Sequence, residues 1–242
     1  MKSKSSASGA SDGRQPGSGP TEVTDGLASA SQRVLAELER GFRDGRYAPG
    51  QRLVAGDLAA DLGMSRAPVR EAFHILAGRG VLELTPNRGV RIRELGARHM
   101  IDMLQLLKVT SALGMELAVP KIAADRKLKS AFRGEAKRLA EVAKKRRPYE
   151  WFLAIDDFHN KIDSLSGNLY LSTALSQLHL TFFHRALGQR LPGPHWSKYA
   201  ANYAEIAAAV AGGLTQESVR LFTAHMDWVI ALLEVDSPSG EG

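Results

Sequence analysis

Cysteine is missing from the sequence altogether. Disulfide bonds and thiolate metal sites are therefore excluded, and the composition suits the reducing conditions of the cytoplasm. Long apolar runs are missing too, since no stretch reaches the roughly 18 apolar residues that a membrane-spanning helix needs. The opening segment, MKSKSSASGASDGRQPGSGPTEVTDG, lacks the apolar middle region of a secretory signal. From these absences we expect a soluble, cytoplasmic protein without a membrane partner.

Aromatic residues make up only 7% of the chain, but 44% of its 242 residues are hydrophobic, which is enough for one large domain or two small ones. Lysine and arginine number 32 and aspartate and glutamate 26, giving a formal net charge of +6. A basic balance of this size suits a nucleic-acid partner without requiring one. The function must therefore be sought in local patterns.

The pattern of side chains divides the chain into four parts. Residues 1–25 are rich in serine and glycine, so we expect a disordered tail, and we expect a second one at 237–242. Residues 26–95 combine three helical patterns with two alternating strands, which predicts a winged helix-turn-helix. Residues 96–236 have helical patterns only. The predicted fold class is mainly α, with the winged helix-turn-helix followed by an all-helical bundle of about six helices.

Three short helices are predicted in the first domain: one from Ser31, one at about Ala55–Leu62, and one that follows Ser65 as N-cap. The third helix has an apolar stripe formed by Val69, Ala72, Phe73 and Leu76. After it, VLELTPNRGVRIREL alternates apolar and polar residues on both sides of a turn, which predicts a β-hairpin.

Two arginines, Arg66 and Arg70, lie one turn apart on the third helix, about 100° round from the centre of the apolar stripe. The major groove of DNA admits a helix, and arginine forms two hydrogen bonds with guanine there. A reading helix needs an apolar stripe behind it and arginines in front. We therefore predict that this helix contacts DNA, in preference to a merely solvated helix face.

The segment LAADLGMSRAPVREAFHILAGRGVLELTPNRGVRI resembles the winged-helix domain of GntR-family transcription regulators. The resemblance implies DNA contacts in the third helix and at the hairpin tip, at Ser65, Arg66, Ala67, Arg70, Asn87, Arg88 and Gly89. Two departures from the family pattern stand out. Ala55–Gly56 occupies the helix opening that usually supplies an arginine, and Ala67 replaces a common threonine. We therefore expect an operator sequence that differs from the usual one.

Residues 97–234 resemble the FCD domain, the effector-binding and dimer-forming helical domain of the FadR-like branch of this family. The segments DDFHNKIDSLSGN and ESVRLFTAHMDWV carry the resemblance. The predicted helices are Ala97–Ile122, Lys127–Lys145, Tyr149–Leu165, Asn168–Leu187, His195–Ala211 and Gln216–Leu233. Asn168 and Thr215 are the expected N-caps. In many relatives an aspartate and three histidines bind a divalent metal, and a small carboxylate effector lies over it.

That ligand set is incomplete in this sequence. His159 and His225 match two of the histidines, whereas Ile155 stands at the aspartate position and Tyr203 at the position of the remaining histidine. Two imidazoles and a phenol suit a Zn²⁺-like ion poorly. A metal site therefore requires a substitute carboxylate.

Asp156 and Asp163 are the candidate substitutes, because each lies within one turn of His159. One hypothesis is a Zn²⁺-like site at His159, His225 and Asp156. The other is direct contact between an effector and His159, Tyr203 and His225 without a metal. Ordinary core packing is the competing interpretation for each of these side chains.

A carboxylate effector also needs a positive partner. Many relatives have an arginine on the first helix of this domain, where Thr110 stands, so Arg185 on the fourth helix is the candidate replacement. The sequence thus predicts a homodimeric repressor that binds a palindromic operator and responds to a small organic acid. The alternative is a metal-dependent helical enzyme that uses His159 and His225. No HExxH motif, nucleophile elbow or phosphate loop supports that alternative.

Overall fold

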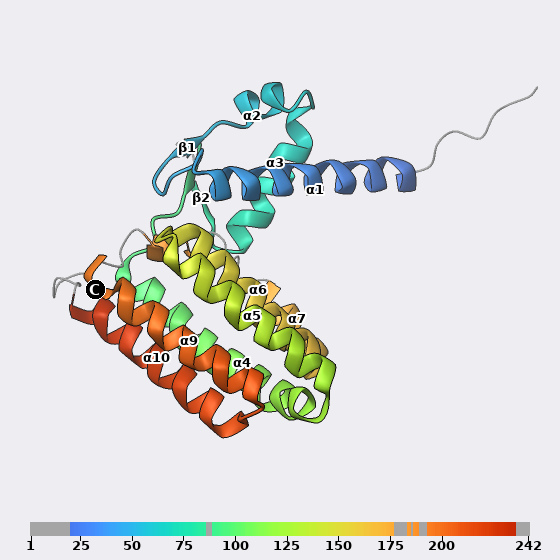
Figure 1. The fold of residues 1–242 in the computed structure, drawn as a ribbon. Coiled ribbons are helices and arrows are strands. Elements are labelled where there is room, and N and C mark those ends of the chain that lie inside the picture. The colour runs from blue at the N-terminus through green and yellow to red at the C-terminus, as the bar shows by residue number, and fades with distance from the viewer. Residues whose placement is uncertain (1–19, 86–88, 177–182, 185, 189–192, 236–242) are drawn as a thin grey trace, which may run out of the picture.

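A computed structural model describes residues 20–85, 89–176, 183–184, 186–188 and 193–235. Figure 1 shows a small part with helices and strands above a larger bundle of helices. The described residues are mainly helical with one three-stranded sheet, which confirms the predicted fold class of a winged helix-turn-helix followed by a helical bundle. Residues 1–19 of the predicted N-terminal tail and all of the C-terminal tail lie outside the described residues.

The elements of the winged-helix part are α1 (Pro20–Asp44), β1 (Arg52–Leu53), α2 (Ala55–Asp61), α3 (Arg66–Gly78), β2 (Leu82–Thr85) and β3 (Gly89–Ile92). All strand pairs are antiparallel, and β3 lies between β1 and β2. The predicted hairpin is confirmed, with Leu82 opposite Ile92 and Leu84 opposite Val90. The apolar stripe of α3 is buried and packs together with Leu38 of α1.

Three details of this part differ from the predictions. Helix α1 begins at Pro20, so the predicted tail is helical from that residue on; proline is favourable at the first position of a helix. Strand β1 was not predicted, because two residues are too few to show an alternation and the strand is fixed by pairing with β3. Ser65 occupies the N-cap position of α3, but its side chain makes no capping hydrogen bond.

The elements of the helical part are α4 (Ala97–Ala124), α5 (Arg126–Lys144), α6 (Pro148–Ser166), α7 (Leu169–Ser176), the 3₁₀ turn η1 (Gly193–His195), α9 (Trp196–Gly212) and α10 (Thr215–Val235). Helices α4, α6, α5, α9 and α10 contact one another in that succession, and α10 packs back against α4. These five helices form a closed ring, visible as the lower part of Figure 1. Of the predicted helix Asn168–Leu187, residues 177–182 and 185 lie outside the described residues.

Large apolar side chains fill the space between these helices, and the start of α7 has a side-chain cap. Trp151, Phe152 and Phe158 of α6 are almost completely buried in its core. Asn168 caps α7 as predicted, accepting hydrogen bonds from two backbone amides, whereas Thr215 is already the first residue of α10. Among the described residues, no helix has both the length and the apolar character to cross a membrane.

Candidate functional site

The outward face of α3 holds the residues of the predicted reading helix. Ser65, Arg66, Ala67 and Arg70 are all exposed. Pro68, in the first turn, is buried together with the apolar stripe, so the opposite face of the helix is left to solvent. Neither Arg66 nor Arg70 forms an ion pair with a residue that the structure describes. Both guanidinium groups therefore remain available to a partner.

Arg66 lies against the start of α2. A methyl group placed on Gly56 would stand 3.3 Å from Nη2 of Arg66, so the missing side chain of Gly56 makes room for the guanidinium. Gly56 belongs to the position where the family usually has an arginine. The guanidinium group of Arg66, on α3, therefore lies beside Gly56, where the arginine that is usual in the family is missing.

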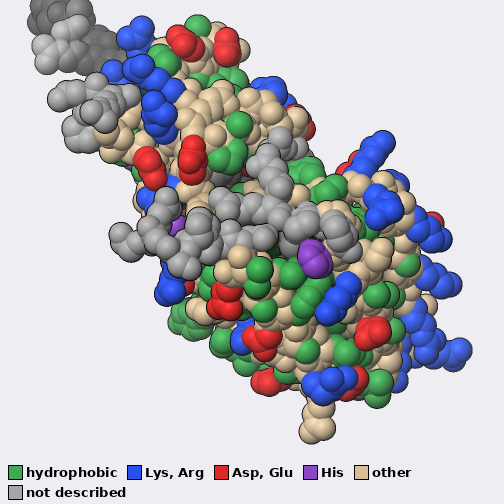
Figure 2. Space-filling model, turned by 90° about the vertical axis from the view of Figure 1, so that its left-hand side faces the viewer, with side chains coloured by type: hydrophobic (Ala, Val, Ile, Leu, Met, Phe, Trp, Pro, Cys, Tyr) green, Lys and Arg blue, Asp and Glu red, His purple; other side chains and the backbone are tan. Residues whose placement is uncertain are grey.

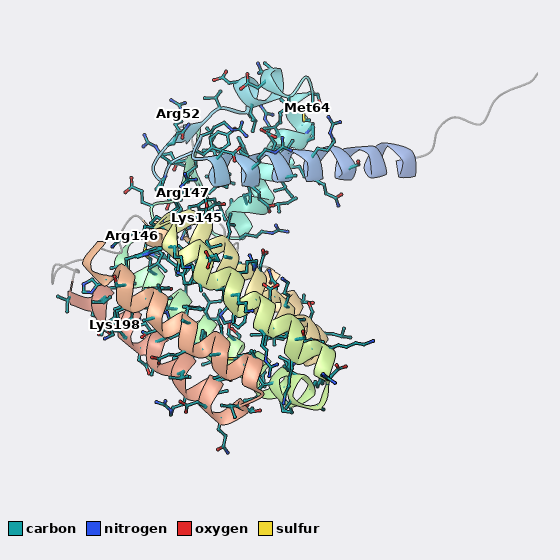
Figure 3. The ribbon with its side chains drawn as sticks, in the orientation of Figure 1. Arg52, Met64, Lys145, Arg146, Arg147 and Lys198 are labelled. Atoms are coloured by element: carbon teal, nitrogen blue, oxygen red, sulfur yellow. The ribbon has the colours of Figure 1, made fainter. Side chains whose placement is uncertain are left out.

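The tip of the β-hairpin is only partly described. Asn87 and Arg88 lie outside the described residues, while Gly89 is exposed and begins β3 with a φ of +89°. The strands add a pair that sequence reasoning missed: Arg52 on β1 is directly opposite Arg91 on β3, and both are exposed. Figure 3 shows Arg52 on the winged-helix part, and Figure 2 shows lysine and arginine side chains on this part as well as on the helical part. Only recognition of β1 as a strand would have revealed this pair.

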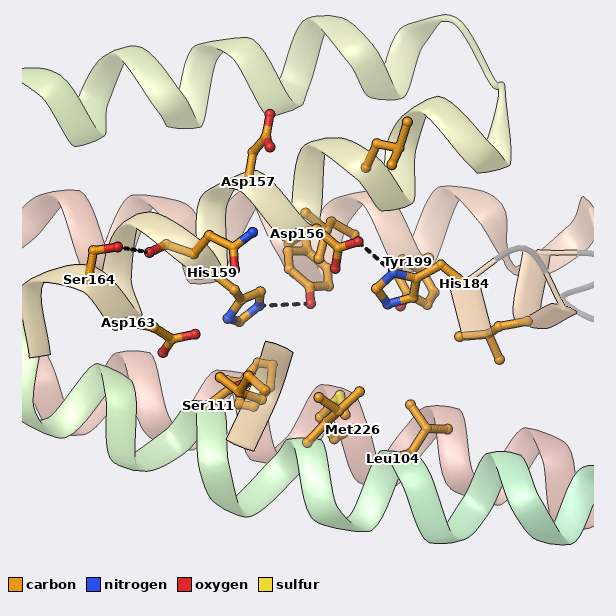
Figure 4. A pocket seen from close by; sticks show the side chains of 18 of the residues that line it. Leu104, Ser111, Asp156, Asp157, His159, Asp163, Ser164, His184, Tyr199 and Met226 are labelled. Carbon is orange, nitrogen blue, oxygen red and sulfur yellow. Dashed lines mark hydrogen bonds and ion pairs between the residues drawn. The ribbon is translucent and has the colours of Figure 1, made fainter. Parts of the chain in front are cut away.

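The helical part contains a cavity of about 530 Å³. Helices α4, α6, α9 and α10 supply most of its lining, and Glu39, Phe42 and Val81 of the winged-helix part also line it. Figure 4 shows side chains of α6 directed into this space from one side and those of α4 from the other. The cavity is therefore lined by both parts of the chain.

His159 and Tyr203 meet in this cavity, as expected. The imidazole Nε2 and the phenol oxygen form a 3.2 Å hydrogen bond. Burial lowers the pKa of His159 to about 4 and raises that of Tyr203, so both are neutral near pH 7. The Nδ1 atom of His159 is buried and has no hydrogen-bond partner among the described residues. The imidazole of His159 is thus held by a hydrogen bond at Nε2 and has none at Nδ1 among the described residues.

His225 packs edge-on against Tyr203, with ring centroids 4.9 Å apart, and is not among the described residues that line the cavity. Its Nδ1 is 3.1 Å from the amide nitrogen of Asn202, and its ring stands edge-on to Tyr199 at 4.4 Å. Burial, together with the nearby His159 and Lys198, lowers the pKa of His225 to about 3. Its Nε2 atom is buried without a hydrogen-bond partner in the described part of the chain.

The metal hypothesis does not fit this arrangement. The carboxylate of Asp156 is hydrogen-bonded to Nδ1 of His184, at a distance of 2.9 Å. Ile155, at the family's aspartate position, belongs to the apolar core. Within the described ranges, no three histidine, aspartate or glutamate side chains lie close enough together to hold a metal ion. The Zn²⁺-like set of His159, His225 and Asp156 is therefore not assembled, because Asp156 is committed to another partner.

Asp163 occupies a more unusual environment. Its side chain is 4% exposed, one carboxyl oxygen has no hydrogen-bond partner among the described residues, and burial raises its pKa to about 7. The carboxyl group fits against Gly114 of α4, where any side chain would overlap it. Ser111, one turn before Gly114, is buried and lines the same cavity.

Of the two candidate partners of a carboxylate effector, the structure places only Thr110, and it does not bring Thr110 to the cavity. The hydroxyl of Thr110 donates to the carbonyls of Leu106 and Leu107 in its own helix, and Thr110 does not line the cavity. Arg185 lies outside the described residues. His184 and Asn202, which orient Asp156 and His225, carried no signal in the sequence because each acts on a side chain of a distant helix.

Comparison with known families gives two matches. Residues 30–92 match the family described as "Bacterial regulatory proteins, gntR family", and residues 105–227 match the FCD domain. The second match alone covers about half of the chain. The two matches follow the division between the winged-helix part and the ring of helices.

Among curated proteins, the chain is 31% identical to an uncharacterized HTH-type transcriptional regulator in an unstable DNA locus of Streptomyces ambofaciens, over 69% of each chain. It is 32% identical to a probable D-xylose utilization operon transcriptional repressor of Paenarthrobacter nicotinovorans, over 55% of this chain and 58% of that protein.

Two solved structures have the same fold. E. coli McbR/YncC has a TM-score of 0.69 at 21% identity, covering 86% of this chain and 98% of its own. A putative GntR regulator from Rhodococcus sp. RHA1 has a TM-score of 0.70 at 24% identity, covering 87% and 100%.

These matches decide between the two functional classes that the sequence left open. The curated relatives are named as transcription regulators, and nothing supports the metal-dependent enzyme. The chain belongs to the GntR family of bacterial regulatory proteins, with an FCD domain as its helical part, and is a DNA-binding transcription regulator rather than an enzyme.

Proposed function

We propose that the chain is a ligand-responsive repressor that reads its operator with α3. The observation that carries this proposal is the exposed pair Arg66 and Arg70, which has no ionic partner in the described residues and is supported from behind by a buried stripe. Arginines near the start of such a helix can form paired hydrogen bonds with guanine in the major groove. Ala67 between them offers only a methyl group.

The remaining predicted contacts fix the position of the protein on the duplex. The backbone amides at the start of α3 and the hydroxyl of Ser65 suit phosphate oxygens. The hairpin tip, with Asn87, Arg88 and Gly89, is proposed to contact the neighbouring groove, and the pair of Arg52 and Arg91 adds positive charge beside it. Contacts of this second kind contribute affinity without reading sequence.

The cavity is the proposed effector site. Because Phe42 and Val81 line it together with residues of the helical part, a bound molecule would touch both parts of the chain. An effector changes DNA binding only if its affinity differs between the DNA-bound and the free arrangement of the two parts. A site lined by both parts can meet that condition, since a change in their arrangement changes the lining. The repressor named among the relatives supports the sign of regulation.

A homodimer is proposed from α4. Leu106, Val109, Leu113 and Leu117 recur along one face of that helix, and all four are exposed, Val109 by 66%. Exposed large apolar residues in one row favour a protein contact. One reading helix covers only a few base pairs, whereas two subunits joined by this face would read a palindrome with half-sites about one DNA turn apart. The occupant proposed for the row is therefore a second copy of the chain.

DNA binding by the full chain tests the proposal, with fluorescence anisotropy on a labelled duplex from upstream of its gene and a scrambled duplex as competitor. Arg66→Ala and Arg70→Ala should each weaken specific binding by roughly tenfold to hundredfold, because each removes a paired contact worth about 1–3 kcal/mol. Arg133→Ala, an exposed arginine of α5, is the matched control and should bind like the parent chain. Unchanged specific binding in both α3 variants would overturn the assignment of the reading helix.

The same assay tests the dimer. Val109→Glu places a charge in the middle of the apolar row and should convert the protein to a monomer in sedimentation velocity, with a parallel loss of operator affinity. The exposed Glu116 of the same helix, changed to Gln, is the control. A Val109→Glu protein that remains dimeric would place the contact elsewhere.

A further inference from the structure

The ionisable groups around the cavity are predominantly acidic. Glu39, Asp156, Asp157 and Asp163 line it, and no lysine or arginine is found among its described lining residues. A buried carboxylate ligand needs a positive partner, since a charge removed from water without one is strongly disfavoured. Among the described lining residues, such a ligand finds no lysine or arginine to pair with.

Two of the aspartates already have partners. Asp156 pairs with His184, and Asp157, at the rim, lies 3.5 Å from a guanidinium nitrogen of Arg138. Asp163 has no such partner among the described residues, although it is buried and its carboxyl group is directed into the cavity (Figure 4). The unpartnered oxygen, Oδ1, lies against Gly114, and a buried carboxyl group without a hydrogen bond costs free energy that a ligand bound to the group would recover in part.

The groups beside Asp163 can also accept hydrogen bonds. His159 lies one turn before it on α6, and its buried Nδ1 is unpartnered among the described residues. In the tautomer that donates from Nε2 to the oxygen of Tyr203, this Nδ1 is an acceptor. The rings of Tyr203 and Phe222 line the same space, and aromatic faces attract cations.

We propose that the cavity binds a cationic effector, an organic amine whose ammonium group is held by the carboxylate of Asp163 and by Nδ1 of His159. This inference rests on the proposed effector site and specifies its ligand. An ammonium group has three donors and one positive charge, which match two acceptors and an aromatic wall. Burial raises the pKa of Asp163, and a bound ammonium group would favour the ionised carboxyl group.

The other lining residues indicate the shape and polarity of the part of the ligand that carries the ammonium group. Leu104, Leu107 and Met226 provide an apolar wall, and about 530 Å³ is within the usual range for a small organic molecule. A short hydrocarbon or aromatic body attached to the ammonium group would fill that space. The inferred ligand class is therefore an amphiphilic amine rather than an organic acid.

Isothermal titration calorimetry on the full chain tests the inference with three probes of similar shape: 2-phenylethylammonium, 3-phenylpropanoate and 2-phenylethanol. At about pH 8 the carboxyl group of Asp163 is ionised and the amine keeps its charge. The ammonium probe should bind at least roughly tenfold more tightly than the carboxylate and the alcohol, the advantage expected of a charge-assisted contact. Equal binding of all three, tighter binding of the carboxylate, or no binding of the ammonium would overturn the inference.

Asp163→Asn removes the negative charge at nearly constant shape and should abolish the advantage of the ammonium probe. Asp102→Asn is the matched control, because Asp102 is an exposed aspartate of α4 that pairs with Arg98 of its own helix. Circular dichroism checks that both variants fold. If Asp163→Asn does not fold, the preference of the parent chain among the three probes still tests the inference. An ammonium advantage that survives in a folded Asp163→Asn protein would place the cation elsewhere and contradict the inference.

DNA anisotropy separates this inference from the proposed function. If 2-phenylethylammonium binds through Asp163 but leaves operator affinity unchanged, the cation site stands and the effector role of the cavity fails. If 3-phenylpropanoate binds instead and releases DNA, the effector role stands and the cation site fails.

Discussion

The exposed face of α3 and the cavity of the helical part use their polar residues in opposite ways. On α3, Arg66 and Arg70 stand within one turn and are open to solvent, so their charges are hydrated and immediately available. In the cavity the polar groups come from several helices, and burial shifts the pKa values of Asp163 and His159 toward the neutral forms. The proposed DNA-binding surface keeps its charges in water, whereas burial in the proposed effector cavity favours the neutral forms of these two groups.

The cost of the two arrangements differs as well. The exposed Arg66 and Arg70 remain hydrated in the free protein, so they cost little free energy on folding. The unpartnered atoms of Asp163, His159 and His225 each lose hydration on folding. Stability of the protein should therefore respond to changes in the cavity, and DNA affinity to changes on α3.

The largest effect on stability is expected at Gly114, where the carboxyl group of Asp163 leaves no room for a side chain. Gly114→Ala would push a methyl group into the carboxyl group of Asp163, so we expect a loss of about 2 kcal/mol in the free energy of unfolding, measured by urea denaturation. Gly134→Ala in α5 is the matched control, because its added methyl group meets nothing within 4 Å; it should stabilise the protein by up to about 1 kcal/mol. If both alanines stabilise alike, α4 and α6 are not packed as closely as described.

The second prediction concerns pH. The pKa of Asp163 is about 7 in the folded protein against 3.8 in the reference state, so between these values the folded protein holds a proton that the unfolded chain has lost. Stability from this group is therefore full at low pH and decreases as the pH rises toward 7. Asp163→Asn removes this dependence, and its stability relative to the parent chain should rise by about 2 kcal/mol between pH 5 and pH 8.

The buried histidines change stability with pH in the opposite sense. Their contribution cancels when the free energy of unfolding of Asp163→Asn is compared with that of the parent chain at the same pH. The pKa values of His159 and His225 are lowered to about 4 and about 3, so their contribution is present near neutral pH and lost as the pH falls. Denaturation of both proteins at several pH values measures the difference. A difference that does not change with pH would mean that Asp163 is ionised in the fold.

The smallest effect is expected for DNA affinity, from a substitution beside α3. Gly56→Ala places a methyl group 3.3 Å from the guanidinium of Arg66, which must shift by a few tenths of an ångström. Operator affinity should fall by only about threefold, less than 1 kcal/mol, while stability is unchanged or slightly raised. Gly78→Ala at the end of α3, with nothing within 4 Å, is the control and should bind DNA normally. A stability loss without a change in affinity would remove the contrast between the two regions.

Prediction from the sequence succeeded where the deciding pattern is local. The stripe of α3, the hairpin register and the starts of most helices follow from periodicity and caps, and each agrees with the structure. It failed at β1, whose two residues become a strand only by pairing with β3. It also failed at Asp156, since a spacing of three residues from His159 cannot reveal that His184, on another segment, takes up the carboxylate.

The sequence alone determined that a helix beginning beside Ser65 would bury one face and expose Arg66 and Arg70, because a helix repeats every 3.6 residues whatever surrounds it. Only the tertiary structure decided which buried polar atoms would find partners. Asp163 and His159 share a face of α6, but what reaches them depends on α4, α9 and α10. The physical reason is that desolvation and hydrogen bonding depend on neighbours in space, and those neighbours are far apart along the chain.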